Sequence, residues 1–283
     1  MSEKTAMSEK IAMSEETAMG EATVNDGPIV ERILITNDDG INAPGLAILE
    51  AIARKLANEV WIVAPEHDRS GAGQSISIHD PLRVYETGTR RYAVSGTPAD
   101  CVLYSLAKWF EETPPDLVLS GVNCGANISD SVQYSGTVGA VLSALHMNIP
   151  AIALSQAFLS REGIQWDPVR QFGELVIRKL WQSSEIRAWN VNFPACDADD
   201  IKLARWCRQS TGSIQRSRLL AGKDARSLPY WWLGFDRDSR HIVEPDADVS
   251  VLREKAIAIQ PLRHQDPLPG GSTEFDLAAS AVD

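Results

Sequence analysis

Short apolar segments alternate along most of the chain with segments whose apolar residues recur at helical spacing. The strand-like segments are residues 32–36, 59–65, 115–121, 150–155 and 188–194, the helix-like segments are 43–57, 135–147 and 167–181, and residues 92–110 hold a short strand followed by a helix. Strands separated by helices pair in parallel, because each helix returns the chain to the same end of the sheet. The pattern predicts an α/β fold, with a mostly parallel sheet and helices on both faces.

The alternation of strand-like and helix-like segments stops after Pro194. The chain therefore divides into a core and regions with other sequence patterns. We expect a core at residues 29–199 and an extension at 200–262, which is rich in arginine, tryptophan and turns and ends in one returning strand. The hexad repeat of residues 1–28 has a period that matches no helix seam, so a disordered tail is expected. Residues 263–283 are turn-rich and acidic, which predicts a flexible tail.

The charge and composition of the chain limit the classes of partner that it can bind. The 283 residues include 27 lysines and arginines against 38 aspartates and glutamates, a net charge of −11. Such a chain is a poor general binder of nucleic acid or of anionic membranes, although a small anionic substrate held by a cation is compatible with it. No uncharged apolar run approaches the length of a membrane span, and the four widely spaced cysteines form no CxxC pair. Reduced thiols and a cytoplasmic location are therefore expected.

Polar residues follow three of the predicted strands. The sequence ERILITNDDG places Asp38 and Asp39 directly after an apolar strand. A loop with Ser70 follows the next strand, and Asn123 follows the strand at 115–121. Adjacent carboxylates repel one another unless a cation or open solvent compensates their charge. Because the carboxyl ends of parallel strands meet at one edge, these oxygen donors converge there, and they suit Mg²⁺, Mn²⁺ or Ca²⁺ better than zinc.

A predicted helix starts at the sequence YSGTVGA, with Ser135, Gly136 and Thr137 in its first turn. Free amides and the dipole at a helix N-terminus favour a bound anion such as phosphate. A simpler interpretation is that Ser135 only caps the helix. Together with a cation site at the same sheet edge, the pattern indicates phosphate-ester chemistry, in which Asp38 or Asp39 orients or deprotonates the attacking water.

Five motifs together resemble one known family. ILITNDDGINAPG, VAPEHDRSGAGQSIS, SGTPADCV, PDLVLSGVNCGAN and YSGTVGA occur in the order and spacing of the SurE (survival protein E) family, and the resemblance runs from about Ile33 to Pro261. It implies a Rossmann-like core and a C-terminal hairpin extension that swaps between the subunits of a homodimer or homotetramer. It also implies a divalent-metal-dependent nucleotidase, which hydrolyses nucleoside 5'- and 3'-monophosphates to nucleoside and phosphate.

The resemblance also assigns roles to individual residues. It implies one Mg²⁺ or Mn²⁺ per subunit, with metal ligands at Asp38, Asp39, Ser70 and Asn123, the positions that the oxygen-donor argument also reaches. The two aspartates are the expected catalytic residues. The residues expected to contact the phosphate or the rest of the substrate are Gly40, Asn42, Gly71, Asn127, Ser135, Gly136 and Thr137.

Three positions depart from the family pattern. Gln74 stands where the family usually has histidine, and Cys124 where it commonly has arginine or lysine. Residues 246–248 read Asp-Ala-Asp, where the family often has Asp-Thr-Asp. Neither Gln74 nor Cys124 is an expected metal ligand, so these two departures bear on substrate preference rather than on activity.

Two other classes of protein share parts of the pattern. Response-regulator receiver domains carry an acidic pair after the first strand and bind Mg²⁺, but Ser120 stands here at the position of their phosphoacceptor aspartate. The separation between Asp39 and Ser120 is also too long for a receiver domain. A metal- or nucleotide-binding module without catalysis would carry the same donors, and release of phosphate from a nucleotide distinguishes an enzyme from such a module.

Overall fold

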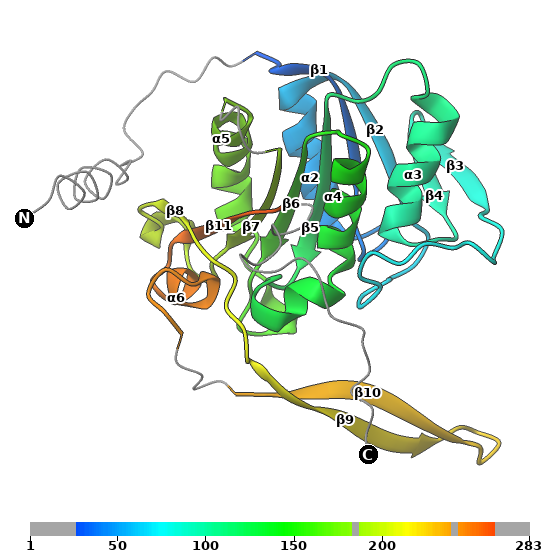
Figure 1. Ribbon diagram of the computed structural model, residues 1–283, viewed down its shortest axis with the longest axis vertical. Coiled ribbons are helices and arrows are strands. Elements are labelled where there is room, and N and C mark those ends of the chain that lie inside the picture. Colours follow the sequence, from blue (N-terminus) through cyan, green and yellow to red (C-terminus); the bar gives the residue numbers. More distant parts are fainter. Residues whose placement is uncertain (1–26, 183–186, 239–242, 264–283) are drawn as a thin grey trace, which may run out of the picture.

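The computed structural model describes residues 27–182, 187–238 and 243–263. One central sheet has the strand order β3-β4-β2-β1-β5-β6-β7-β11-β8, and β9 pairs with β10 in a separate hairpin (Figure 1). The elements are β1 (Val30–Thr36), α2 (Pro44–Leu56), β2 (Ala57–Pro65), β3 (Val84–Gly88), β4 (Arg91–Val94), α3 (Pro98–Trp109), β5 (Leu117–Cys124), η1 (Ser129–Tyr134), α4 (Gly136–His146), β6 (Ala151–Gln156), η2 (Arg161–Gly163), α5 (Asp167–Gln182), β7 (Ala188–Phe193), η3 (Ala198–Asp200), β8 (Ala204–Trp206), β9 (Ile214–Lys223), β10 (Pro229–Arg237), α6 (Asp248–Arg253) and β11 (Ile257–Pro261).

The predicted mostly parallel sheet is confirmed. Strands β4, β2, β1, β5, β6 and β7 pair in parallel in that order. Antiparallel pairs occur toward the two edges, where β3 pairs with β4 and β11 pairs with β7. The returning strand expected near the end of the extension is β11, which together with β8 completes the central sheet. Part of the segment at 200–262 therefore belongs structurally to the core.

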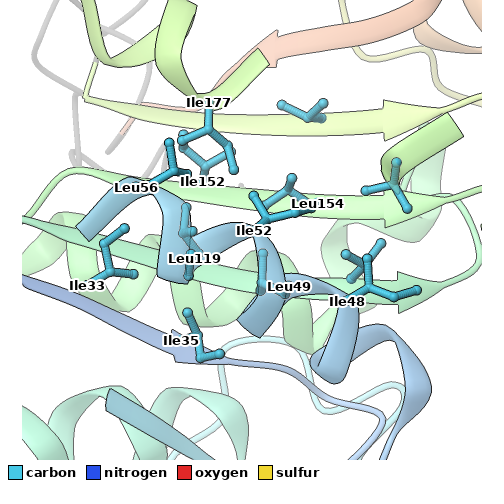
Figure 2. Close-up of a cluster of buried hydrophobic side chains, with 14 of the residues drawn as sticks. Ile33, Ile35, Ile48, Leu49, Ile52, Leu56, Leu119, Ile152, Leu154 and Ile177 are labelled. Atoms are coloured by element: carbon cyan, nitrogen blue, oxygen red, sulfur yellow. The ribbon is translucent and has the colours of Figure 1, made fainter. Parts of the chain in front are cut away.

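Helices cover both faces of the sheet, with α2 and α5 on one face and α3 and α4 on the other (Figure 1). Along β1, Ile33 and Ile35 pack in the first layer and Leu34 in the second, because successive side chains of a strand point to opposite faces. In the first layer, Ile52 of α2 and Ile177 of α5 pack against the strands (Figure 2). The continuous apolar strands of the sequence are thus explained by burial on both faces.

Local sequence signals start the helices where they were predicted. Pro44 is the first residue of α2, where a missing N–H costs nothing. Thr97 and Asp100 form a capping box at α3, in which each side chain accepts a hydrogen bond from the other residue's backbone N–H. Ser135 caps α4, because its hydroxyl accepts a hydrogen bond of 3.1 Å from the N–H of Val138.

The hairpin of β9 and β10 projects from the body of the protein (Figure 1). Its large apolar side chains do not fold back on the central sheet, and Trp231, Trp232 and Leu233 are 58%, 69% and 68% exposed. A hairpin in this region is what the family resemblance implies. An isolated two-stranded hairpin is marginally stable in water, so these side chains need further contacts to be buried.

The two predicted tails fall almost entirely outside the described residues. In the described part of the chain, no helix is long and apolar enough to cross a membrane. The four cysteines are free thiols, and Cys101, Cys196 and Cys207 are buried.

Candidate functional site

The candidate site lies where the strand order of the sheet reverses. From β1 the chain passes through α2 to β2 on one side, whereas β5 pairs with β1 on the other side. A crevice forms outside the carboxyl ends of strands at such a reversal. Asp38 and Asp39 follow β1, and Asn123 lies near the end of β5. The fold therefore brings these predicted residues to one edge.

The turn after β1 is closed by Asn37. Its side-chain amide donates a hydrogen bond of 2.9 Å to the carbonyl of Gly40, and its side-chain oxygen accepts one of 3.2 Å from the N–H of Gly40. Gly40 has a φ of 101°, which a residue with a side chain rarely adopts. Gly40 thus serves the turn that presents the two aspartates. Asn42, a predicted substrate contact, lies beyond this turn and is exposed.

Asp38 is a buried carboxylate, with 4% of its surface exposed. Its Oδ1 accepts a hydrogen bond of 2.7 Å from the hydroxyl of Thr137 in the first turn of α4. Burial raises the pKa of Asp38 to about 6, the hydrogen bond from Thr137 opposes this rise, and the neighbouring charge of Asp39 adds to it. In the described part of the chain, no salt bridge involves Asp38. A positive charge beside this pair would therefore be stabilising.

Gly136 lets α4 approach Asp38 closely. A Cβ atom at this position would lie 2.8 Å from the Cβ of Asp38 and 3.1 Å from its Oδ2. The helix start predicted to bind phosphate thus lies directly against the first aspartate. Thr137 donates a hydrogen bond to the carboxylate, and Ser135 caps the helix beside it.

Asp39 is anchored on the other side of the turn. Its Oδ2 accepts a hydrogen bond of 2.9 Å from the backbone N–H of Cys124 in β5. This bond ties the acidic pair to the end of the neighbouring strand, directly after Asn123. Cys124 therefore contributes through its backbone, which is independent of the side chain at that position.

Asn123 is presented by an irregularity in β5. The pairing register between β5 and β6 shifts between Ser120 and Asn123, and such shifts re-aim side chains next to functional sites. The Nδ2 of Asn123 donates a hydrogen bond of 2.8 Å to the carbonyl of Gly125. Its Oδ1 has no hydrogen bond to any of the described residues, so a neutral oxygen donor remains available at the cavity.

The loop with Ser70 packs over the first aspartate. The N–H of Arg69 donates to the carbonyl of Asp38 at 2.7 Å, and the N–H of Ser70 donates to Asp68 Oδ1 at 2.7 Å. Gly71 follows with a φ of 83°. The loop is thus fixed through its backbone, and the hydroxyl of Ser70 lies at the wall of the cavity.

A cavity of about 740 Å³ collects most of the predicted site residues. Those that line it are Asp38, Ser70, Gly71, Asn123, Asn127 and Ser135. Asp39, Gly40, Asn42, Gly136 and Thr137 do not line it, and all of these except Asn42 support Asp38 or the turn that carries it. The predicted set therefore divides into residues at the cavity and residues behind it.

Asn127 belongs to a buried hydrogen-bond network behind the cavity wall. Its side-chain amide donates to the hydroxyls of Ser155, at 2.9 Å, and of Thr137, at 3.3 Å. Its backbone carbonyl accepts from the side chains of Asn190 and Asn192 in β7. Asn127 thus holds Thr137, which in turn holds Asp38, and this chain of bonds fixes the orientation of the buried carboxylate.

The oxygen donors at this edge fit a hard divalent cation. Asp38, Ser70 and Asn123 line one cavity, and Asp39 follows Asp38 in the chain. The described residues contain no group of three or more His, Cys, Asp or Glu that could hold a metal. A buried carboxylate with a second carboxylate beside it is the arrangement that a dication compensates. The donor set is unlike that of a zinc site rich in cysteine and histidine.

Tyr134, Phe158 and Arg237 line the cavity and are not among the site residues predicted from the sequence. Arg237 comes from the end of β10, in the segment whose sequence is rich in arginine and tryptophan. Arg237 reaches the site through contacts between segments that are far apart in the chain, so no local sequence signal predicts its position.

Comparison with known proteins identifies the family of the chain. Residues 33–216 match the family described as Survival protein SurE. The chain belongs to the SurE family. Its relatives include 5'-nucleotidase SurE 1 of Burkholderia lata, 43% identical over 242 residues that cover 84% of this chain and 92% of the relative. The 5'-nucleotidase SurE of Bradyrhizobium diazoefficiens is 44% identical over 237 residues, which cover 82% of this chain and 93% of the relative.

A solved SurE structure has the same fold. The crystal structure of the SurE protein from Aquifex aeolicus is 31% identical to this chain, with a TM-score of 0.70 over 83% of this chain and 94% of that one. The family resemblance and the Rossmann-like fold expected from the sequence are therefore confirmed.

Replacing Thr137 tests whether the network behind the cavity orients Asp38. Thr137→Val keeps the shape but removes the hydroxyl, which leaves Asp38 without a buried hydrogen bond worth about 1.5–3 kcal/mol. We expect a lower melting temperature and a drop of about tenfold in kcat/KM for nucleotide hydrolysis, equivalent to about 1.4 kcal/mol. Thr137→Ser keeps the donor and should remain close to the parent protein. Parental kinetics in Thr137→Val would contradict this role.

Proposed function

We propose that this protein is a divalent-metal-dependent nucleotidase that releases phosphate from nucleoside 5'- and 3'-monophosphates. The observation that carries the proposal is the buried Asp38 beside Asp39, at the cavity that also presents Ser70 and Asn123. The relatives named 5'-nucleotidase SurE support the same activity. The proposed activity on 3'-monophosphates rests on the family resemblance.

One Mg²⁺ or Mn²⁺ per subunit would be held by Asp38, Asp39, Ser70 and Asn123. When bound, the cation would polarise a phosphoryl oxygen and lower the pKa of a coordinated water from about 15.7 toward neutrality. The donor set supports this assignment, because it offers two anionic and two neutral oxygens and lies at a partly buried edge.

The protein's own residues position the reacting groups. Thr137 fixes one oxygen of Asp38, and the amide of Cys124 fixes one oxygen of Asp39. Either carboxylate can orient the attacking water or accept its proton. Because both aspartates are held by buried or backbone donors, little reorganisation is needed during the reaction.

The cavity also has space and surfaces for the rest of a nucleotide. Its volume of about 740 Å³ lies in the range of small-molecule sites. Gly71, Asn127 and Ser135 are the predicted contacts that line it, and Tyr134 and Phe158 add aromatic rings on which a base can stack. We propose that the phosphate is bound at the aspartate end, with the nucleoside toward these rings.

Assembly through the hairpin is proposed on the basis of its exposed apolar side chains. Trp231, Trp232 and Leu233 would be covered by a second copy of the chain in a homodimer or homotetramer. The net charge of −11 supports a role without stable binding to nucleic acid. A cytoplasmic location is likewise proposed, with the four free cysteines in its support.

Chelation tests the proposed metal chemistry. EDTA should abolish release of phosphate from AMP, because the attacking water and the phosphoryl oxygen lose their activating cation, and Mn²⁺ or Mg²⁺ should restore it. Asp39→Asn should lose most activity while remaining folded. The matched control is Asp80→Asn, which removes one carboxylate from an exposed loop outside the cavity and should leave activity unchanged. Full activity in metal-free buffer would refute the metal mechanism.

Light scattering tests the proposed assembly. The intact protein should have at least the mass of a dimer at micromolar concentration, since burial of the two tryptophan side chains stabilises association. Replacing both Trp231 and Trp232 with alanine should shift the mass toward a monomer. Tyr85→Ala is the control, because Tyr85 is an exposed aromatic residue on the edge strand β3. A monomeric parent protein would exclude assembly through the hairpin.

A further inference from the structure

Arg237 connects the hairpin to the catalytic cavity. It is the last residue of β10, and the register of the hairpin shifts between Asp236 and Arg237, where Arg237 pairs with Ile214 at the start of β9. Arg237 lines the cavity that Asp38 also lines, although the two residues are far apart in the sequence. The base of the hairpin is therefore part of the cavity wall.

Two contacts with η1 hold this end of the hairpin in place. The ring of Phe235 lies 5.4 Å from the ring of Tyr134, which itself lines the cavity. Asp130 accepts hydrogen bonds from the backbone N–H groups of Gly212, at 3.1 Å, and Ile214, at 2.8 Å. These amides hold the pKa of Asp130 below its usual value. The carboxylate that binds the base of the hairpin is therefore ionised at neutral pH.

The charges at the cavity give Arg237 a distinct position. Among the described residues that line the cavity, Asp38 and Arg237 are the ones with charged side chains. The neighbouring hairpin residues Arg216 and Arg218 both pair with Asp236. Arg237 forms no salt bridge with the described residues, and it is an exposed residue that lines the cavity. Its guanidinium is thus free for a ligand.

A phosphate monoester needs such a group. The two adjacent aspartates together offset the charge of one divalent cation, so a cation bound there would leave little net positive charge for an anionic substrate. A phosphate near Asp38 is otherwise repelled by that carboxylate. Guanidinium groups bind phosphate oxygens through two parallel hydrogen bonds, which combine charge with geometry.

We propose that Arg237 binds the phosphate group of the substrate, and that the base of the β9–β10 hairpin is therefore a part of the active site. This inference rests on the proposed nucleotidase function. It assigns to the extension a role in substrate binding in addition to its role in assembly.

Steady-state kinetics of Arg237→Met tests the proposal with two substrates, AMP and p-nitrophenyl phosphate, which share only the phosphate ester. The KM should rise by about tenfold for both, with kcat changed less than threefold, and the increase of KM with added NaCl should weaken because a charge contact has been lost. Arg237→Lys keeps the charge and should recover most of the loss. Arg226→Met, in the turn at the far end of the hairpin, removes the same charge outside the cavity and should match the parent protein.

Binding of inorganic phosphate, measured by calorimetry on the full-length protein with Mn²⁺ present, gives a readout that does not depend on turnover. The dissociation constant should rise by about tenfold in Arg237→Met, and light scattering should show an unchanged mass. Unchanged KM and unchanged phosphate binding in Arg237→Met would overturn the proposal.

A KM increase confined to AMP would also overturn the proposal, because Arg237 would then contact the nucleoside. A parent protein that binds phosphate but hydrolyses neither ester would refute the proposed function while leaving the assignment of Arg237 intact.

Discussion

Two carboxylates stand side by side at the end of a buried strand, and this repulsion organises the surrounding edge of the sheet. Asp38 is almost fully buried, and Asp39 is tied to the next strand by the amide of Cys124. Desolvation and the neighbouring charge both oppose ionisation of Asp38. Such a pair persists where the fold holds it rigidly and where a cation compensates its charge. Hydrogen bonds meet the first condition, and the proposed cation site would meet the second.

The rigid support comes from both sides of the switch point. On one side, Gly136 lets α4 pack against Asp38, and Thr137 donates to its carboxylate. On the other side, the irregular register of β5 presents Asn123 beside the acidic turn. A buried network that begins at Asn190 and Asn192 in β7 reaches Asp38 through Asn127 and Thr137. The start of α4 and a network that extends to β7 thus hold one carboxylate at the end of β1.

Much of this architecture could be predicted from the sequence because its signals are local. Apolar periodicity indicated the strands and the two helical layers, the proline and capping residues indicated where α2, α3 and α4 begin, and the chemistry of Asp38, Asp39, Ser70 and Asn123 indicated one cluster of oxygen donors. The strand β3 was not predicted, because its residues are mostly exposed and lack an apolar run.

The remaining features depend on contacts between distant segments. The hydroxyl of Thr137 points at Asp38 only because α4 packs at the end of β1, so a sequence reading placed Thr137 among the substrate contacts instead. Arg237 reaches the cavity because η1 anchors the base of the hairpin through Tyr134 and Asp130. The sequence of that segment is rich in arginine and tryptophan but gave no sign that one arginine would line the cavity.

The central claim is that the adjacent aspartates form a cation site, and thermal unfolding with and without Mn²⁺ tests it most directly. A cation at a hundred times its dissociation constant stabilises the folded state by about 2.7 kcal/mol. For a domain of this size that corresponds to an increase of about 5–10 °C in melting temperature. Asp39→Asn should melt at or above the parent protein in EDTA, because one repelling charge is gone, and should gain little from Mn²⁺. A parent protein whose melting temperature is unchanged by Mn²⁺, or an Asp39→Asn variant that gains as much, would contradict the account.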